Sequence, residues 1–220
     1  MFTGFQPASM NDRSSSTTTI DLTILQQTVN ALTAAPSPLP PADSVVASLL
    51  QAEKAAKRSK TPSRPEGLLG GWRLQFVTGT QRARQRAGIV LGAGRFLPRW
   101  VNISLTFTAT PLSSERPVPS LANQGTLLNR VEFAGLKLEL SGPSRFWSPS
   151  ILSFDFTQIN VNLFGLRLYR GYLWGGEAKE QQFAQQALKE QAFFNFFLIE
   201  EQFIAARGRG GGLALWTRQA

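Results

Sequence analysis

The chain of 220 residues contains no cysteine and no histidine. Without thiols it forms no disulfide, and without thiolate or imidazole groups it lacks the usual zinc ligands and the commonest nucleophiles and bases. An enzyme made from this chain would depend on carboxylates, lysine, serine or tyrosine alone. We therefore expect a protein that is not an enzyme and that has no metal site and no cofactor.

Long apolar runs are also missing. No run approaches the roughly 18 consecutive apolar residues that a transmembrane helix needs. The segment from Phe2 to Ser16 has no continuous apolar core of the kind that a secretory signal requires. We therefore expect a soluble or peripheral protein.

Acidic residues are absent between Gly67 and Ser114, and the whole chain carries a net charge of +9. In the loop Gln81–Arg99 arginines lie close to apolar and aromatic residues, a combination that suits the boundary of an anionic membrane. The predicted membrane or partner surface consists of Arg82, Arg84, Arg86, Arg95, Phe96, Arg99 and Trp100. A solvated basic loop is the first alternative. Nucleic-acid binding is less favoured, because few aromatic residues are available for base stacking.

The first part of the chain, residues 1–66, has the pattern of a helical arm and linker. Apolar residues at helical spacing predict one helix from Thr19 or Asp21 to about Ala34. A cluster of prolines follows, and a second helix is expected to begin near Asp43. The sequence does not indicate whether this arm packs on the rest of the protein.

The second part, residues 67–220, has the alternating pattern of short strands. We expect a mainly β fold, a lipocalin-like antiparallel barrel of about eight strands, with an open sandwich as the alternative. The alternation changes parity between Phe156 and Ile159, which predicts a bulge or a strand break. One inserted helix is expected over Glu177–Gln191, before the last hairpin.

Aromatic residues of these strands are expected to form the barrel interior, either as a packed core or, at one open end, as the lining of a ligand cavity. The predicted lining consists of Trp72, Phe76, Phe107, Phe133, Phe154 and Phe156, with Glu200 and Arg207. An inward Glu200 would need a cationic partner such as Arg207 or Arg167. Glu200 and Glu201 are not expected to act as a catalytic pair, because neighbours on a strand point to opposite faces.

Two segments together resemble a known family. The segment GGWRLQFVTGT at Gly70–Thr80 and the segment FFLIEEQFIAARGRGGGLALW near the C-terminus resemble the plastid lipid-associated proteins, also called fibrillins, and in particular their cyanobacterial members. The segment at Phe154–Gly171 is similar to the middle strands of that family. The resemblance covers roughly Leu68 to Arg218. Ile204 stands where the plant pattern has an arginine, so no ligand role is transferred to that position.

The resemblance implies a lipocalin-like barrel that associates peripherally with thylakoid membranes, cyanobacterial or plastid. It implies a non-catalytic role in photoprotection or lipid handling, with a lipid, isoprenoid or quinone as ligand. The partners would be anionic membrane lipids or a small apolar molecule. A structural or assembly factor that docks on a photosynthetic membrane complex is the main alternative, and a chaperone-like bilin lyase is a further one.

Overall fold

The computed structural model describes residues 22–34, 37–59, 65–79, 94–109, 124–147, 149–173 and 175–219. Within these residues, 8 antiparallel strands close into a barrel, and 3 further strands lie outside the ring. The fold is mainly β, as predicted. The ring consists in spatial order of β1 (Gly70–Val77), β3 (Asn102–Ala109), β4 (Gln124–Phe133), β5 (Leu136–Trp147), β6 (Ile151–Phe154), β9 (Ala192–Ile199), β10 (Phe203–Gly208) and β11 (Leu213–Arg218).

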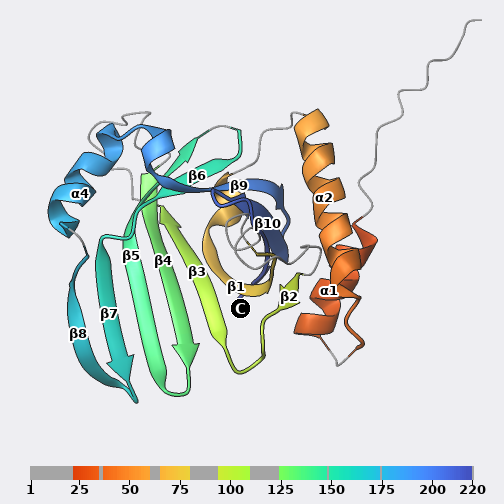
Figure 1. The fold of residues 1–220 in the computed structure, drawn as a ribbon, viewed down its shortest axis with the longest axis horizontal. Helices are drawn as coiled ribbons and strands as arrows, with labels where there is room; N and C mark the ends of the chain where they lie inside the picture. The colour runs from red at the N-terminus through yellow and green to blue at the C-terminus, as the bar shows by residue number, and fades with distance from the viewer. Residues whose placement is uncertain are drawn as a thin grey trace, which may run out of the picture.

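The strands outside the ring are β2 (Arg95–Phe96), β7 (Gln158–Leu163) and β8 (Leu166–Tyr172). Strand β2 pairs with β1, whereas β7 and β8 continue from β5. Strand β5 divides its pairing, because Leu136–Ser141 pair with β7 and Ser144–Trp147 pair with β6. The outer parts of β4 and β5, together with β7 and β8, therefore leave the barrel as a sheet, which we call the sheet extension (Figure 1).

The predicted parity change is a strand break between β6 and β7. Here the Asp155 amide donates to the Pro143 carbonyl at 3.1 Å, and the Thr157 amide donates to the Ser141 carbonyl at 3.0 Å. The crossing chain lies so close to β5 that a Cβ on Gly142 would be 2.1 Å from the Asp155 carbonyl oxygen. Only glycine fits at this crossing without a backbone shift.

Two helices, α1 (Thr23–Thr33) and α2 (Ala42–Ser59), lie against the outer wall of the barrel (Figure 1). Their apolar residues recur at helical spacing, so each helix presents one stripe to its neighbour. These stripes form one core with outward-facing side chains of β1, β9, β10 and β11. The helices contribute Leu25, Val29, Val45 and Leu49 to this core, and the strands contribute residues that include Phe197, Phe203, Leu213 and Leu215. The helical arm therefore packs on the barrel.

A second core fills the barrel itself. Strand β11 shows the separation of the two cores, because Leu213 and Leu215 contact the helices while Ala214 and Trp216 point inward. Alternation along a strand sends successive side chains to opposite faces, so both faces of this wall are buried. The inner core includes Leu68, Trp72, Leu105, Phe107, Leu127, Phe146, Leu152, Phe154, Phe196, Ile204 and Trp216.

The inserted helix is present but shorter than expected. It consists of α4 (Gly176–Gln182), followed by two single 3-10 turns, η2 (Phe183–Gln185) and η3 (Leu188–Glu190). Phe183 is its one large buried side chain, and Ala187 already has an extended backbone. A run of glutamines, lysines and glutamates offers no second apolar turn, so the helix ends where its buried contact ends. A further 3-10 turn, η1 (Pro65–Leu68), precedes β1.

Candidate functional site

The barrel interior is occupied by aromatic rings that contact one another. Phe194 lies centrally in this set, with ring centroids 5.0 Å from Phe154 and 5.5 Å from Trp216. Phe196 links the set to Phe107 at 6.2 Å, and Phe156 extends it from Phe154 at 5.2 Å. Such distances are those of favourable offset and edge-to-face pairs. The middle of the barrel is therefore a packed core.

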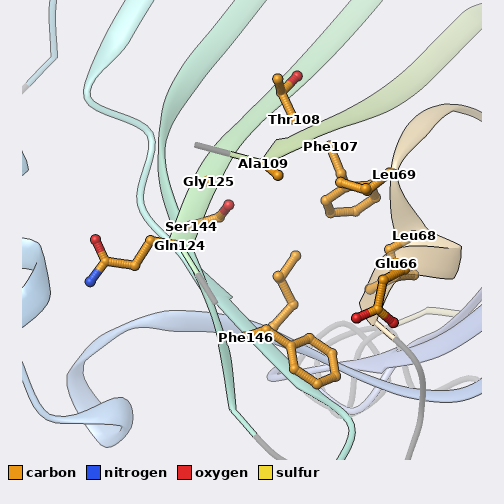
Figure 2. A pocket seen from close by; sticks show the side chains of 11 residues that line it. Glu66, Leu68, Leu69, Phe107, Thr108, Ala109, Gln124, Gly125, Ser144 and Phe146 are labelled. Atoms are coloured by element: carbon orange, nitrogen blue, oxygen red, sulfur yellow. The ribbon is translucent and has the colours of Figure 1, made fainter. Parts of the chain in front are cut away.

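One end of the barrel has a recess, which we call the mouth recess (Figure 2). Its volume is about 130 Å³, below the 300 Å³ or so at which sites for whole drug-sized ligands begin. It is lined by Glu66, Leu68, Leu69, Phe107, Thr108, Ala109, Gln124, Gly125, Ser144, Phe146 and Leu152. These residues come from η1 and Leu69, which follows it, and from the parts of β3, β4, β5 and β6 that meet at this edge.

The lining of the mouth recess is mainly apolar. Figure 2 shows the Gln124 amide directed away from the Phe107 ring, so this polar group lies toward the rim. Glu66 is the one carboxylate of the lining, and Ser144 and Thr108 supply hydroxyl groups. Acid–base chemistry by paired carboxylates requires two such groups within reach of one substrate. The arrangement suits contact with an apolar chain end better than catalysis.

The six aromatic residues of the predicted lining separate into three environments. Trp72, Phe107 and Phe154 are buried inside the barrel, and Phe156 packs against the same core. Of these, only Phe107 reaches the mouth recess.

The expected inward position of Phe76 is wrong. The register of β1 shifts between Leu74 and Phe76, where Gln75 is the extra residue of a bulge. Phe76 therefore points outward into the core beneath the helices, where its ring meets Phe96 edge to face at 4.9 Å. A bulge reverses the face of every residue beyond it.

The expected inward position of Phe133 is wrong as well. Phe133 is the last residue of β4, beyond the barrel, and its side chain is 46% exposed. Its ring lies 5.0 Å from that of Trp100, in the turn before β3. Phe133 thus belongs to the sheet extension.

Glu200 and Arg207 do not form the predicted pair. Glu200 is exposed in the turn between β9 and β10, where its amide donates to the Phe203 carbonyl at 3.0 Å. Arg207 instead contacts Glu53 of α2, with Nε donating to Oε1 at 2.8 Å and Nη2 donating to Oε2 at 2.5 Å. Arg207 also donates to the Gly211 carbonyl at 2.6 Å, so it ties the last hairpin to the helical arm.

Glu53 is an almost fully buried carboxylate, 5% exposed, and Lys57 approaches its Oε1 at 3.0 Å. The hydrogen bonds from Arg207 lower the pKa of Glu53 below its ordinary value of 4.5, against the opposing effect of burial. The same contact raises the pKa of Arg207. Both oxygens of the buried Glu53 carboxylate accept hydrogen bonds from Arg207. The two residues therefore form a structural ion pair between the helical arm and the barrel.

The predicted basic surface is only partly within the described residues. Arg82, Arg84 and Arg86 lie outside them. Arg95, Arg99 and Trp100 are exposed, whereas Phe96 is partly buried against Phe76. The Arg99 carbonyl accepts a hydrogen bond from Arg73 at 3.0 Å, which holds the turn that carries Trp100.

The sheet extension has one apolar face that sequence reasoning did not identify. By register, Leu138 and Leu140 of β5 lie on the same face as Val161 and Ile159 of β7, and this face is continuous with the barrel interior. These side chains are half-buried. At the outer end, Trp100, Phe133, Leu136 and Phe164 surround an open hollow of about 430 Å³. The sequence signal for this site was the Phe164-Gly165 pair. It occupies a hairpin turn in which asparagine usually precedes glycine.

The described residues contain neither a membrane-spanning helix nor a metal-binding cluster. None of the helices in the described ranges is long and apolar enough to cross a membrane. Among the same residues, no three acidic, histidine or cysteine side chains are grouped in a way that could hold a metal ion.

Comparison with known proteins does not identify a family for this chain. No family model matches the chain, and no curated protein matches it. Among solved structures the chain is similar to a redesigned β-barrel, at 11% identity over 70% of this chain and 94% of that chain, with a TM-score of 0.32. The closed ring of paired strands itself establishes the barrel.

Proposed function

We propose that this protein is a non-catalytic lipid-binding protein that acts at a membrane surface. The observation that carries the proposal is the mouth recess, an apolar opening at the end of a closed barrel. Its size suits the end of an acyl or prenyl chain, with the remainder of the molecule outside the barrel. The net charge of +9 favours a surface of anionic lipids.

The finer form of the proposal comes from the family resemblance. The segments at Gly70–Thr80, Phe154–Gly171 and the C-terminus resemble the fibrillins. On that basis we propose peripheral association with thylakoid membranes and a role in photoprotection or lipid handling, with an isoprenoid or quinone as one class of ligand.

The first test is identification of bound lipid by native mass spectrometry, after incubation of the full chain with a lipid extract from photosynthetic membranes. Ala109 lies exposed at the rim of the mouth recess, so Ala109→Trp should fill the recess without disturbing the core. We expect bound lipid in the wild type and a loss of at least about tenfold in the variant, because the bulky ring removes the apolar contact area.

The matched control is Ala47→Trp, the same change at an exposed position of α2, away from the recess. Equal lipid loading of both variants would show that the recess is not the site. An absence of lipid from the wild type would contradict ligand binding altogether.

A second candidate function is that of an assembly factor docking on a photosynthetic membrane complex. The filled barrel interior and the exposed apolar end of the sheet extension favour this alternative. It predicts a stoichiometric complex with a membrane protein after mild crosslinking, together with a lipid-free barrel.

A further inference from the structure

Three turns at one end of the sheet extension carry large exposed apolar side chains. The turn before β3, the β4–β5 hairpin and the β7–β8 hairpin all lie at the lower end in Figure 1. We call this group the aromatic tip; its members and their exposed fractions are Trp100 66%, Phe133 46%, Leu136 40%, Phe164 78% and Leu166 71%. Exposed apolar residues are ordinary singly, but a contiguous group at one protruding end indicates a contact surface.

Phe164 occupies a turn position whose backbone conformation disfavours a bulky side chain. Both hairpins are two-residue turns with positive φ at each central residue: 46° at Ala134, 83° at Gly135, 48° at Phe164 and 82° at Gly165. Asparagine, aspartate or glycine normally takes the first of these positions. A bulky residue with positive φ is a genuine outlier, and such strain is concentrated at functional sites.

The aromatic tip is also preorganised. The Phe164 amide donates to the Gly135 carbonyl at 2.8 Å, so the two turns are hydrogen-bonded to each other. The Phe164 ring lies over Gly135, where a Cβ would be 2.4 Å from a ring carbon. Trp100 and Phe133 form a ring pair, with centroids 5.0 Å apart.

The hydrogen bond between the two turns favours a partner that is an apolar medium. Backbone groups that are already paired within the protein make transfer into an apolar medium less unfavourable. A loop whose turn amides depended on water would resist that transfer.

Of the charged residues directly next to a member of the aromatic tip, Arg99, Lys137 and Arg167 are cationic, and Glu132 is the one carboxylate. Arg99 precedes Trp100, and Arg167 follows Leu166; both are exposed, and neither forms an ion pair within the described part of the chain. Lys137 pairs with Glu139 at 3.1 Å, on the opposite face of β5 from Leu136 and Leu138. Apolar rings at the apex with arginines just behind them complement the anionic boundary of a bilayer.

We propose that the aromatic tip inserts into the interfacial region of an anionic lipid bilayer, with Arg99 and Arg167 against the lipid phosphates. The inference rests on the proposed function at a membrane surface and specifies which surface makes the contact. A protruding end built from turns suits a planar bilayer better than a peptide, which would require a groove or a paired edge.

The test is flotation of the full-length protein with vesicles made from equal parts of phosphatidylcholine and phosphatidylglycerol. The variant Trp100→Gln/Phe164→Asn removes the two most exposed rings of the aromatic tip, and asparagine is favoured at the second position by the turn. We expect its partition into vesicles to fall by about tenfold for each ring removed. The control Leu39→Gln/Leu50→Asn changes two exposed leucines of the helical arm, 43% and 45% exposed, and should leave partition unchanged. Should the double variant unfold, Phe164→Asn alone provides the comparison.

A second measurement reports position rather than affinity. Vesicles with brominated acyl chains should quench the tryptophan fluorescence of the wild type, and this quenching should be largely lost in Trp100→Phe. Retained quenching in Trp100→Phe would overturn the inference.

The outcomes separate the two proposals. Binding by the wild type with unchanged binding by the double variant would overturn the aromatic tip and leave membrane association standing. No binding of the wild type to either anionic or purely zwitterionic vesicles would contradict the proposed function as well. A dimer that becomes monomeric on Phe164→Asn, with vesicle binding unaffected, would identify the aromatic tip as a contact between copies of the chain and also overturn the inference.

Discussion

The barrel wall and the sheet extension use the same antiparallel pairing but differ in burial. In β10, Phe203, Ile204, Ala205 and Ala206 are all buried, because the helices cover one face and the inner core covers the other. In β8, the residues from Leu166 to Arg170 are all exposed. Strand β10 accordingly has a continuous apolar run, whereas β8 has arginines among its apolar residues, as an open edge requires.

The barrel and the sheet extension have different roles, one in stability and the other in contact. The barrel and its two cores provide most of the buried apolar surface and so most of the stability. The extension contributes little burial at its outer end and is the part available for contact. Substitutions in the barrel should therefore mainly lower stability, whereas substitutions at the outer end of the sheet extension should mainly lower binding.

The largest effect is expected from Trp72→Ala, in the inner core. Trp72 is fully buried, and its indole N–H donates to the Leu68 carbonyl at 2.8 Å. We expect the free energy of unfolding to fall by about 3–5 kcal/mol, measured by urea denaturation. The comparable change Leu168→Ala in the extension, where the side chain is 60% exposed, should alter it by no more than about 0.5 kcal/mol. Similar losses in both variants would show that the barrel and the sheet extension contribute equally to stability.

An intermediate effect is expected where the helical arm is joined to the barrel. Arg207→Met leaves the Glu53 carboxylate buried with Lys57 as its remaining partner, and should lower the free energy of unfolding by about 1–3 kcal/mol near neutral pH. Because the folded-state pKa of Glu53 is lowered, this ion pair stabilises the fold above the ordinary value of 4.5 and less as the pH falls below it. The difference between wild type and variant should therefore shrink in acid. A difference independent of pH would argue against the ion pair as its source.

The smallest effect on stability is expected from Phe164→Asn, at the aromatic tip. Asparagine tolerates the positive φ of 48° better than phenylalanine, so the free energy of unfolding should stay unchanged or rise by up to about 1 kcal/mol. Thermal denaturation measures this change. A clear loss of stability would mean that the Phe164 ring supports the fold, and would weaken the distinction between the two regions.

Much of the fold could be predicted from local patterns. Alternation located the barrel strands, the parity change before Ile159 located the break between β6 and β7, and proline and helical spacing located the two helices of the arm. These signals arise from each segment's own periodicity. The position of Phe76 could not be obtained in this way, because nothing in its neighbours distinguishes a bulge at Gln75 from a regular strand.

The candidate site was less predictable, because its residues are brought together by contacts between distant parts of the chain. Phe107 and Phe133 both lie in alternating strands, yet one is inside the barrel and the other is beyond its edge. The partner of Arg207 is 154 residues away along the chain, on a helix whose docking the sequence did not indicate. Such contacts depend on where distant elements meet.

Composition and periodicity alone exclude thiol and imidazole chemistry from these 220 residues, give them a strongly positive charge and assign alternating strands to their second part. Contacts between elements that are distant in the sequence set which alternating residues became core and which became surface. Closure of the ring through β4–β5 and β1–β11, and the splitting of β5 between β6 and β7, set that boundary. Strand periodicity assigns a side chain to a face, whereas burial of that face depends on the layer packed against it.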